Sequence, residues 1–112
     1  MKKYLLAGVL SAFSISAMAD STCQGKITYV GISRGANVLV SGPGGLPSTY
    51  LCDLQEKQNN VEPEACKAIY SALLSAKAQD KSVRITFNPN ISSCSEVASW
   101  GWAKDFNWVL ID

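Results

Sequence analysis

Four cysteines, Cys23, Cys52, Cys66 and Cys94, constrain this 112-residue chain more than any other feature. An even cysteine count in a small exported protein is typical of a disulfide framework. No two of them are spaced Cys-x-x-Cys, so the sequence has neither a thioredoxin-like redox motif nor a zinc knuckle. A zinc site of all four cysteines is the alternative, and an oxidising compartment disfavours it. We therefore expect two disulfides, no metal and no cofactor.

Residues 1–19 have the pattern of a secretory signal peptide. Two lysines precede an apolar run, and Ala17-Met18-Ala19 matches a cleavage site. The run is shorter than the roughly 20 apolar residues that span a bilayer. We predict cleavage after Ala19 and one domain over residues 20–112, in a bacterial protein that is periplasmic or secreted. A lipid anchor on Cys23 is disfavoured, because Asp20 stands where bacterial lipoprotein signals have an apolar residue.

Charge and the absence of histidine exclude several function classes. The chain has ten basic and nine acidic residues, and removing residues 1–19 takes two lysines, which leaves eight against nine. This balance provides no field that would attract nucleic acid or an anionic membrane. With no histidine, the chain lacks the commonest general base and the usual Ser-His and Cys-His nucleophile pairs. We expect a protein that is not an enzyme, binds no nucleic acid and spans no membrane.

The residue pattern predicts a mainly β domain with one helix. The expected strands cover residues 26–32, 36–41, 49–54, 82–88 and 106–111, and the expected helix covers residues 63–79. Residues 82–88 show the clearest alternation, with Val83, Ile85 and Phe87 on one face. The order strand-strand-strand-helix-strand-strand is that of the OB-fold, a small Greek-key barrel. We predict a five-stranded OB-like barrel stapled by disulfides; an α+β sheet with a helix on one face is the alternative.

The helix prediction rests on its first residue and its apolar stripe. Pro63 suits the first helical position, because that position needs no backbone N–H. Apolar residues recur at helical spacing. The expected stripe contains Ala65, Ile69, Ala72, Leu73 and Ala76.

A family resemblance covers residues 25–89. It is carried by Tyr50-Leu51-Cys52, by Cys66 fourteen positions after Cys52, and by residues 82–89, which read SVRITFNP. Together they resemble the B subunits of subtilase cytotoxin and typhoid toxin, exported OB-fold proteins that form pentameric rings and bind host glycans. The cysteine count alone permits three disulfide connectivities. The resemblance implies a Cys52–Cys66 bond, and with it Cys23–Cys94.

The chain departs from that family in two places. A serine before the first strand and a tyrosine late in the VRI strand contact sialic acid in the family, and the matching residues here are Gln24 and Phe87. Phe87 has no hydroxyl group, so the family's sugar site does not carry over. The tryptophan-containing C-terminal part also differs from the family's usual ending.

Aromatic residues are the best candidates for a binding site. Trp100 and Trp102 would share a face if that segment were extended, and tryptophan suits sugar stacking or protein contact. The alternative is that both close the end of the core. Tyr29 and Arg34, on or near the first hairpin, are further candidates. Trp108 alternates with neighbouring apolar residues and is expected in the core.

These observations favour an exported, non-enzymatic binding module. By resemblance it would bind a glycan, as a homo-oligomer of toxin B-subunit type. A periplasmic immunity or inhibitor protein that binds a secreted enzyme fits the size, the signal peptide and the cysteines equally well.

Overall fold

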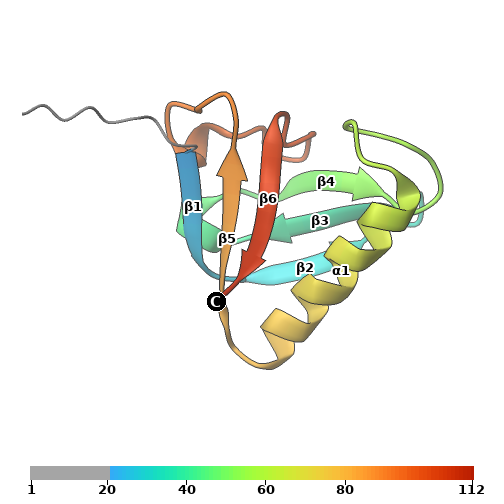
Figure 1. The fold of residues 1–112 in the computed structure, drawn as a ribbon, viewed down its shortest axis with the longest axis horizontal. Coiled ribbons are helices and arrows are strands. Elements are labelled where there is room, and N and C mark those ends of the chain that lie inside the picture. The colour runs from blue at the N-terminus through green and yellow to red at the C-terminus, as the bar shows by residue number, and fades with distance from the viewer. Residues whose placement is uncertain (1–20) are drawn as a thin grey trace, which may run out of the picture.

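Residues 21–112 fold into two three-stranded sheets and one helix in the computed structural model, which describes this range of the chain. The predicted signal peptide and its cleavage site lie outside the described residues. In Figure 1 one sheet stands upright on the left, and the strands of the other run across behind it towards the helix. No helix among residues 21–112 is long and apolar enough to cross a membrane.

Both sheets are antiparallel. The first has the order β1-β5-β6, with bounds Ser21–Lys26, Ser82–Phe87 and Phe106–Ile111. The second has the order β2-β3-β4, with bounds Tyr29–Ile32, Asn37–Ser41 and Thr49–Asp53. Short 3₁₀ turns, η1 (Pro43–Gly45) and η2 (Cys94–Glu96), lie in the connections. The mixed α+β class is thus confirmed.

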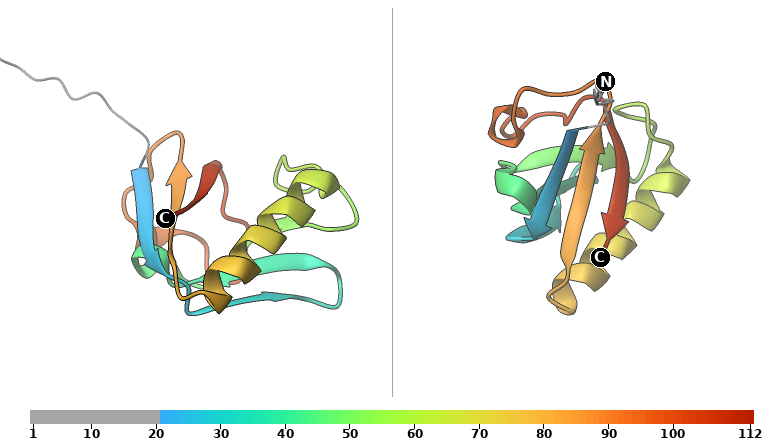
Figure 2. Two further views of the ribbon diagram at one scale, coloured as in Figure 1. Left: turned by 60° about the horizontal axis from the view of Figure 1, so that its bottom comes forward. Right: turned by 60° about the vertical axis from the view of Figure 1, so that its left-hand side comes forward.

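Helix α1 (Pro63–Ala78) begins at the predicted proline. Its fully buried residues are Cys66, Leu73 and Ala76. The expected stripe began instead at Ala65, which is exposed. At this end of the helix the buried position belongs to Cys66, which forms the disulfide with Cys52 in β4. The two turned views in Figure 2 show α1 running diagonally beside the sheets.

The prediction of one strand over residues 26–32 is wrong. The chain bends at Ile27 and Thr28, so that β1 belongs to one sheet and β2 to the other. The Thr28 N–H donates to the carbonyl of Ser41 at 2.8 Å. Gly42 follows directly with a φ of 118°, and a Cβ there would overlap the backbone of Thr28. A glycine is therefore required where the chain crosses from one sheet to the other.

The predicted closed five-stranded barrel is not observed: the six strands form two separate three-stranded sheets. The two sheets are nevertheless joined by backbone hydrogen bonds on the C-terminal side. The Tyr50 N–H donates to the carbonyl of Gly101 at 2.7 Å, and the Ala103 N–H donates to the carbonyl of Tyr50 at 2.8 Å. These bonds form a parallel bridge between β4 and the segment that precedes β6.

Trp108 was expected in the core and is 60% exposed. The reason is a register shift between β5 and β6. Ile85 pairs with Val109 and Phe87 pairs with Phe106, so β6 carries one extra residue opposite this stretch of β5. An extra residue reverses the in–out alternation that follows it. Val109 therefore faces the core and Trp108 faces solvent.

One core cluster lies between the sheets and the helix. Its largest fully buried apolar side chains are Phe87, Leu51, Leu73, Ile85, Val38, Val40 and Val83. Two disulfides, Cys23–Cys94 and Cys52–Cys66, reinforce it. This is the pairing that the resemblance implied, and disulfides are consistent with a secreted or periplasmic protein.

Candidate functional site

The aromatic cleft is a half-open hollow of about 270 Å³ over the β2-β3-β4 sheet. It is lined by Tyr29, Gly31, Ile32, Ser33, Asn37, Leu39, Tyr50 and Trp100. Three aromatic rings, from β2, β4 and the loop before β6, thus line one hollow. Concave, mostly apolar surfaces with a few polar groups are the usual form of small-molecule sites.

Trp100 lines the aromatic cleft, and the residue is 62% exposed. Its backbone N–H donates to the carbonyl of Ser48 at 2.7 Å. The Ser48 hydroxyl in turn donates to the Tyr29 hydroxyl at 3.1 Å. Trp100 has a φ of 56°, a conformation that costs a non-glycine residue about 1 kcal/mol. The backbone of this loop is therefore held in one unusual conformation that presents an indole ring to solvent.

Tyr50 is held by the segment that precedes β6. Its ring meets Trp102 edge to face, with the two ring centroids 5.6 Å apart. The Thr49 hydroxyl donates to the carbonyl of Gly101 at 3.0 Å, beside the backbone bonds of the parallel bridge. Trp102 does not line the cleft; it supports Tyr50, which does.

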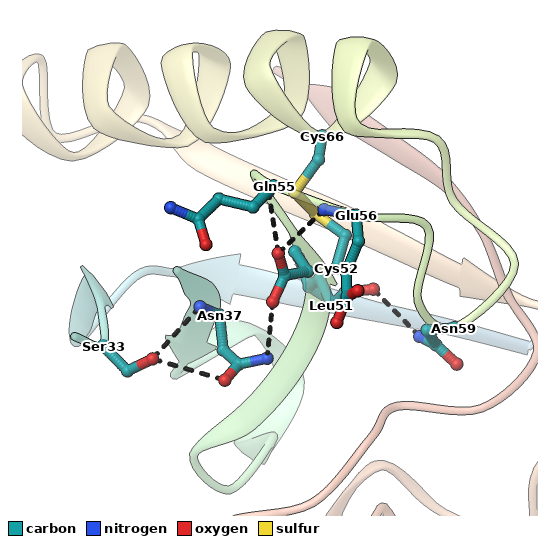
Figure 3. The surroundings of a disulfide bond; sticks show 9 residues. Ser33, Asn37, Leu51, Cys52, Gln55, Glu56, Asn59 and Cys66 are labelled. Atoms are coloured by element: carbon teal, nitrogen blue, oxygen red, sulfur yellow. Dashed lines mark hydrogen bonds between the residues drawn. A yellow bond between two sulfur atoms is a disulfide. The ribbon is translucent and has the colours of Figure 1, made fainter. Parts of the chain in front are cut away.

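A hydrogen-bond network around the buried Asp53 holds the polar side of the cleft (Figure 3). One carboxylate oxygen accepts from the backbone N–H groups of Gln55 and Glu56, at 2.7 and 3.1 Å. The other accepts from the Asn37 side-chain amide at 3.3 Å. The Ser33 hydroxyl accepts from the Asn37 N–H at 3.1 Å. This network links the cleft to the loop that follows Cys52.

The structure brings together two of the four candidate binding residues, Tyr29 and Trp100. Trp102 lies behind Tyr50. Arg34 is exposed in the β2–β3 turn, next to the lining residue Ser33, and forms no salt bridge within residues 21–112.

Sequence reasoning missed Tyr50 as a lining residue. Tyr50 was noted only as part of the resemblance, because nothing in its local pattern shows which face of the sheet it occupies. Its intermediate burial beside the buried Leu51 identifies that face only once the fold is known.

The cleft offers apolar contact and hydrogen bonds, with few groups for other chemistry. Among the residues that the structure describes, no three His, Cys, Asp or Glu side chains lie close enough to hold a metal ion. Ser33, Tyr29, Tyr50 and Asn37 are the lining residues whose side chains have a hydroxyl or amide group. The arrangement suits a ligand with one apolar face and a polar edge.

No protein-family model matches the chain, and comparisons with curated proteins and with solved structures gave no match either.

Proposed function

We propose that this protein is an exported, non-enzymatic binding module whose aromatic cleft holds a sugar ring of a glycan. The observation that carries the proposal is Trp100, a residue that is 62% exposed, has a hydrogen-bonded backbone and lines the cleft together with two tyrosines. A pyranose ring has C–H groups on its faces and hydroxyls around its edge. Its face can cover an aromatic ring while its hydroxyls reach the polar groups of the wall.

Preorganisation supports this use of the cleft. Ordering a mobile side chain on binding costs about 0.5–1.5 kcal/mol, and a site that is already fixed avoids much of that cost. The backbone of Trp100 is tied to Ser48, and the ring of Tyr50 rests on Trp102. A cleft of about 270 Å³ has room for one sugar ring, so specificity would lie in a terminal residue of the glycan.

The OB-like architecture and the toxin B-subunit resemblance belong to the same proposal. The bend between β1 and β2 and the parallel bridge of Tyr50 with Trp102 support an OB-like arrangement. By resemblance the protein would assemble as a pentamer, and β6, the outer strand of its sheet, provides an edge for assembly. Static light scattering of the mature protein should give about five times the monomer mass. A mass equal to that of the monomer would overturn the proposed pentamer.

A glycan array is the test of the sugar site. The mature protein should bind a limited set of glycans, and Trp100→Ala should strongly weaken that binding. Trp108→Ala is the matched control, because this tryptophan is also exposed but lies on β6, outside the cleft. Equal glycan binding by wild type and Trp100→Ala, or none by wild type, would overturn the proposal.

A second candidate function is an inhibitor or immunity protein that binds a secreted enzyme. It is favoured by exposed apolar side chains on β6, where Trp108 is 60% exposed and Leu110 and Ile111 are each 39% exposed. Aromatic side chains are enriched at the centres of protein interfaces. Capture of a periplasmic hydrolase by wild type but not by Trp108→Ala would establish this function in place of the first.

A further inference from the structure

A larger cavity lies on another part of the molecule and shares no lining residue with the aromatic cleft. Its volume is about 760 Å³, within the range of about 300–1,000 Å³ that is usual for ligand sites. It lies between the turn at residues 58–61, the start of α1 and the start of β6. The loop that leads into α1 is on the upper right in Figure 1. We call it the amide cavity, because four asparagines line it: Asn59, Asn60, Asn88 and Asn107.

One wall of the amide cavity is a rigid turn. Val61 N–H donates to the carbonyl of Gln58 at 3.0 Å, and Asn59 and Asn60 between them both have positive φ. The Asn59 side-chain amide donates to the carbonyls of Leu51 and Ala103, at 2.9 and 3.0 Å. This one side chain therefore ties the turn both to β4 and to the segment before β6, and Figure 3 shows its bond to Leu51.

The opposite wall is also fixed by the backbone. The Asn88 N–H donates to the carbonyl of Asp105 at 2.9 Å, which joins the end of β5 to the start of β6. The disulfide from Cys52 to Cys66 anchors the loop that contains the turn. Because both walls are held before any ligand arrives, binding would require little further ordering of the backbone.

The lining groups define the chemistry of the ligand. The side-chain amides of Asn60 and Asn88 are exposed and make no hydrogen bond within residues 21–112. An amide can donate and accept at once, which matches neighbouring hydroxyl groups. Half-buried Ile69 and Phe106 supply an apolar floor.

The charges around the cavity disfavour an anionic ligand. Lys104 is the one basic lining residue, against Glu62 and Asp105. Glu62 also has an ion pair with Lys57 at 3.3 Å. With Lys57 included, two basic and two acidic residues balance here, so a phosphate or a carboxylate would find no net positive charge to attract it. A neutral ligand rich in hydroxyl groups fits both the charge and the amides.

We infer that the amide cavity is a second binding site, for a neutral mono- or disaccharide. The inference rests on the proposed function only for the class of ligand; its residues and its test are separate. Two sites with no shared residue would let one subunit bind two branches of a glycan, and the summed avidity would exceed that of either site.

Amide NMR spectra with neutral sugars as probes test this inference. Glucose, galactose, N-acetylglucosamine and lactose are titrated into the ¹⁵N-labelled mature protein. At least one should shift the side-chain NH₂ signals of Asn60 and Asn88. Asn60→Gly, which keeps the positive-φ backbone, and Asn88→Ala should each weaken that binding about 3- to 10-fold, as expected for one lost hydrogen bond.

Two controls separate this site from the aromatic cleft. Asn90→Ala removes an exposed amide that lies outside the cavity and should leave the titration unchanged. Trp100→Ala should leave the Asn60 and Asn88 shifts intact. Shifts confined to the aromatic cleft would overturn the second site and leave the proposed function standing. Shifts confined to the amide cavity would support the second site and overturn the proposed sugar site in the aromatic cleft. Shifts that survive both asparagine substitutions would also overturn the inference.

Discussion

The aromatic cleft and the amide cavity are built in opposite ways. The aromatic cleft lies on the face of a sheet, and its rings come from strands and from one strained loop. The amide cavity lies between turns and a helix start, and most of its polar side chains come from loops. A different disulfide lies near each site in the chain. Cys23–Cys94 anchors the segment that leads to Trp100, and Cys52–Cys66 closes the loop that forms the turn at residues 58–61. Stability and binding should therefore separate when the disulfides are removed one at a time.

The largest effect is expected from removing Cys23–Cys94. This bond closes a loop of sequence separation 71, so Cys23→Ser with Cys94→Ser should cost about 4 kcal/mol of unfolding free energy. Urea unfolding of the wild type and the double variant measures it. Binding at the aromatic cleft should weaken more than binding at the amide cavity, because the segment before Trp100 is released.

Removing Cys52–Cys66 should cost less, about 3 kcal/mol, because its sequence separation is only 14. In this variant, binding at the amide cavity should weaken more than binding at the aromatic cleft. The same urea titration measures the cost for Cys52→Ser with Cys66→Ser. Two results would contradict this expectation. One is a larger loss of unfolding free energy than in the Cys23→Ser, Cys94→Ser variant. The other is equal weakening of binding at both sites by both double variants.

Asn59 should matter to stability although it is one polar side chain in a loop. Asn59→Gly keeps the positive-φ backbone and removes both hydrogen bonds, at a cost of about 2 kcal/mol. Asn60→Gly is the matched control, because Asn60 has nearly the same φ but no side-chain bond within the described chain; it should be close to neutral. Thermal unfolding compares them, and equal melting temperatures would show that the turn is not held by Asn59.

The smallest effect is expected from a substitution outside both sites, at the Arg84–Asp112 ion pair. A side-chain hydrogen bond from Arg84 holds the pKa of Asp112 below its ordinary value, and Gln24 adds a second bond. The folded carboxylate is therefore favoured: its contribution to stability is present above the unfolded pKa and is lost as the pH falls through the folded one. Arg84→Gln should raise the pKa of Asp112 in an NMR titration, while both sites still bind. An unchanged pKa would show that this bond is not formed in solution.

Local patterns in the sequence predicted the helix start and the C-terminal strand well. Pro63 begins α1, and β6 spans the predicted residues 106–111, because proline chemistry and a short apolar run act locally. Strand β1 was missed because Ser21–Lys26 is rich in small and polar residues, and it is held by pairing with β5, far along the chain. Trp108 was misplaced by one extra residue in β6, which no alternation rule can reveal in advance.

The candidate site was predictable only in part. Tyr29 and Trp100 were identified by residue type, since exposed aromatic residues suit binding. That they line the same cleft depends on the pairing of Trp100 with Ser48, which lies in a different loop. No local pattern in the sequence indicated the amide cavity, because its four asparagines come from three separate stretches of the chain.

The most direct test of the glycan site uses the three tryptophans as separate reporters. Each indole N–H gives one NMR signal, which single Trp→Phe substitutions assign. On titration with a glycan selected by the array, the Trp100 signal should move most, Trp102 less, and Trp108 not at all, in keeping with their places in the structure. Movement of the Trp108 signal without that of Trp100 would contradict the account.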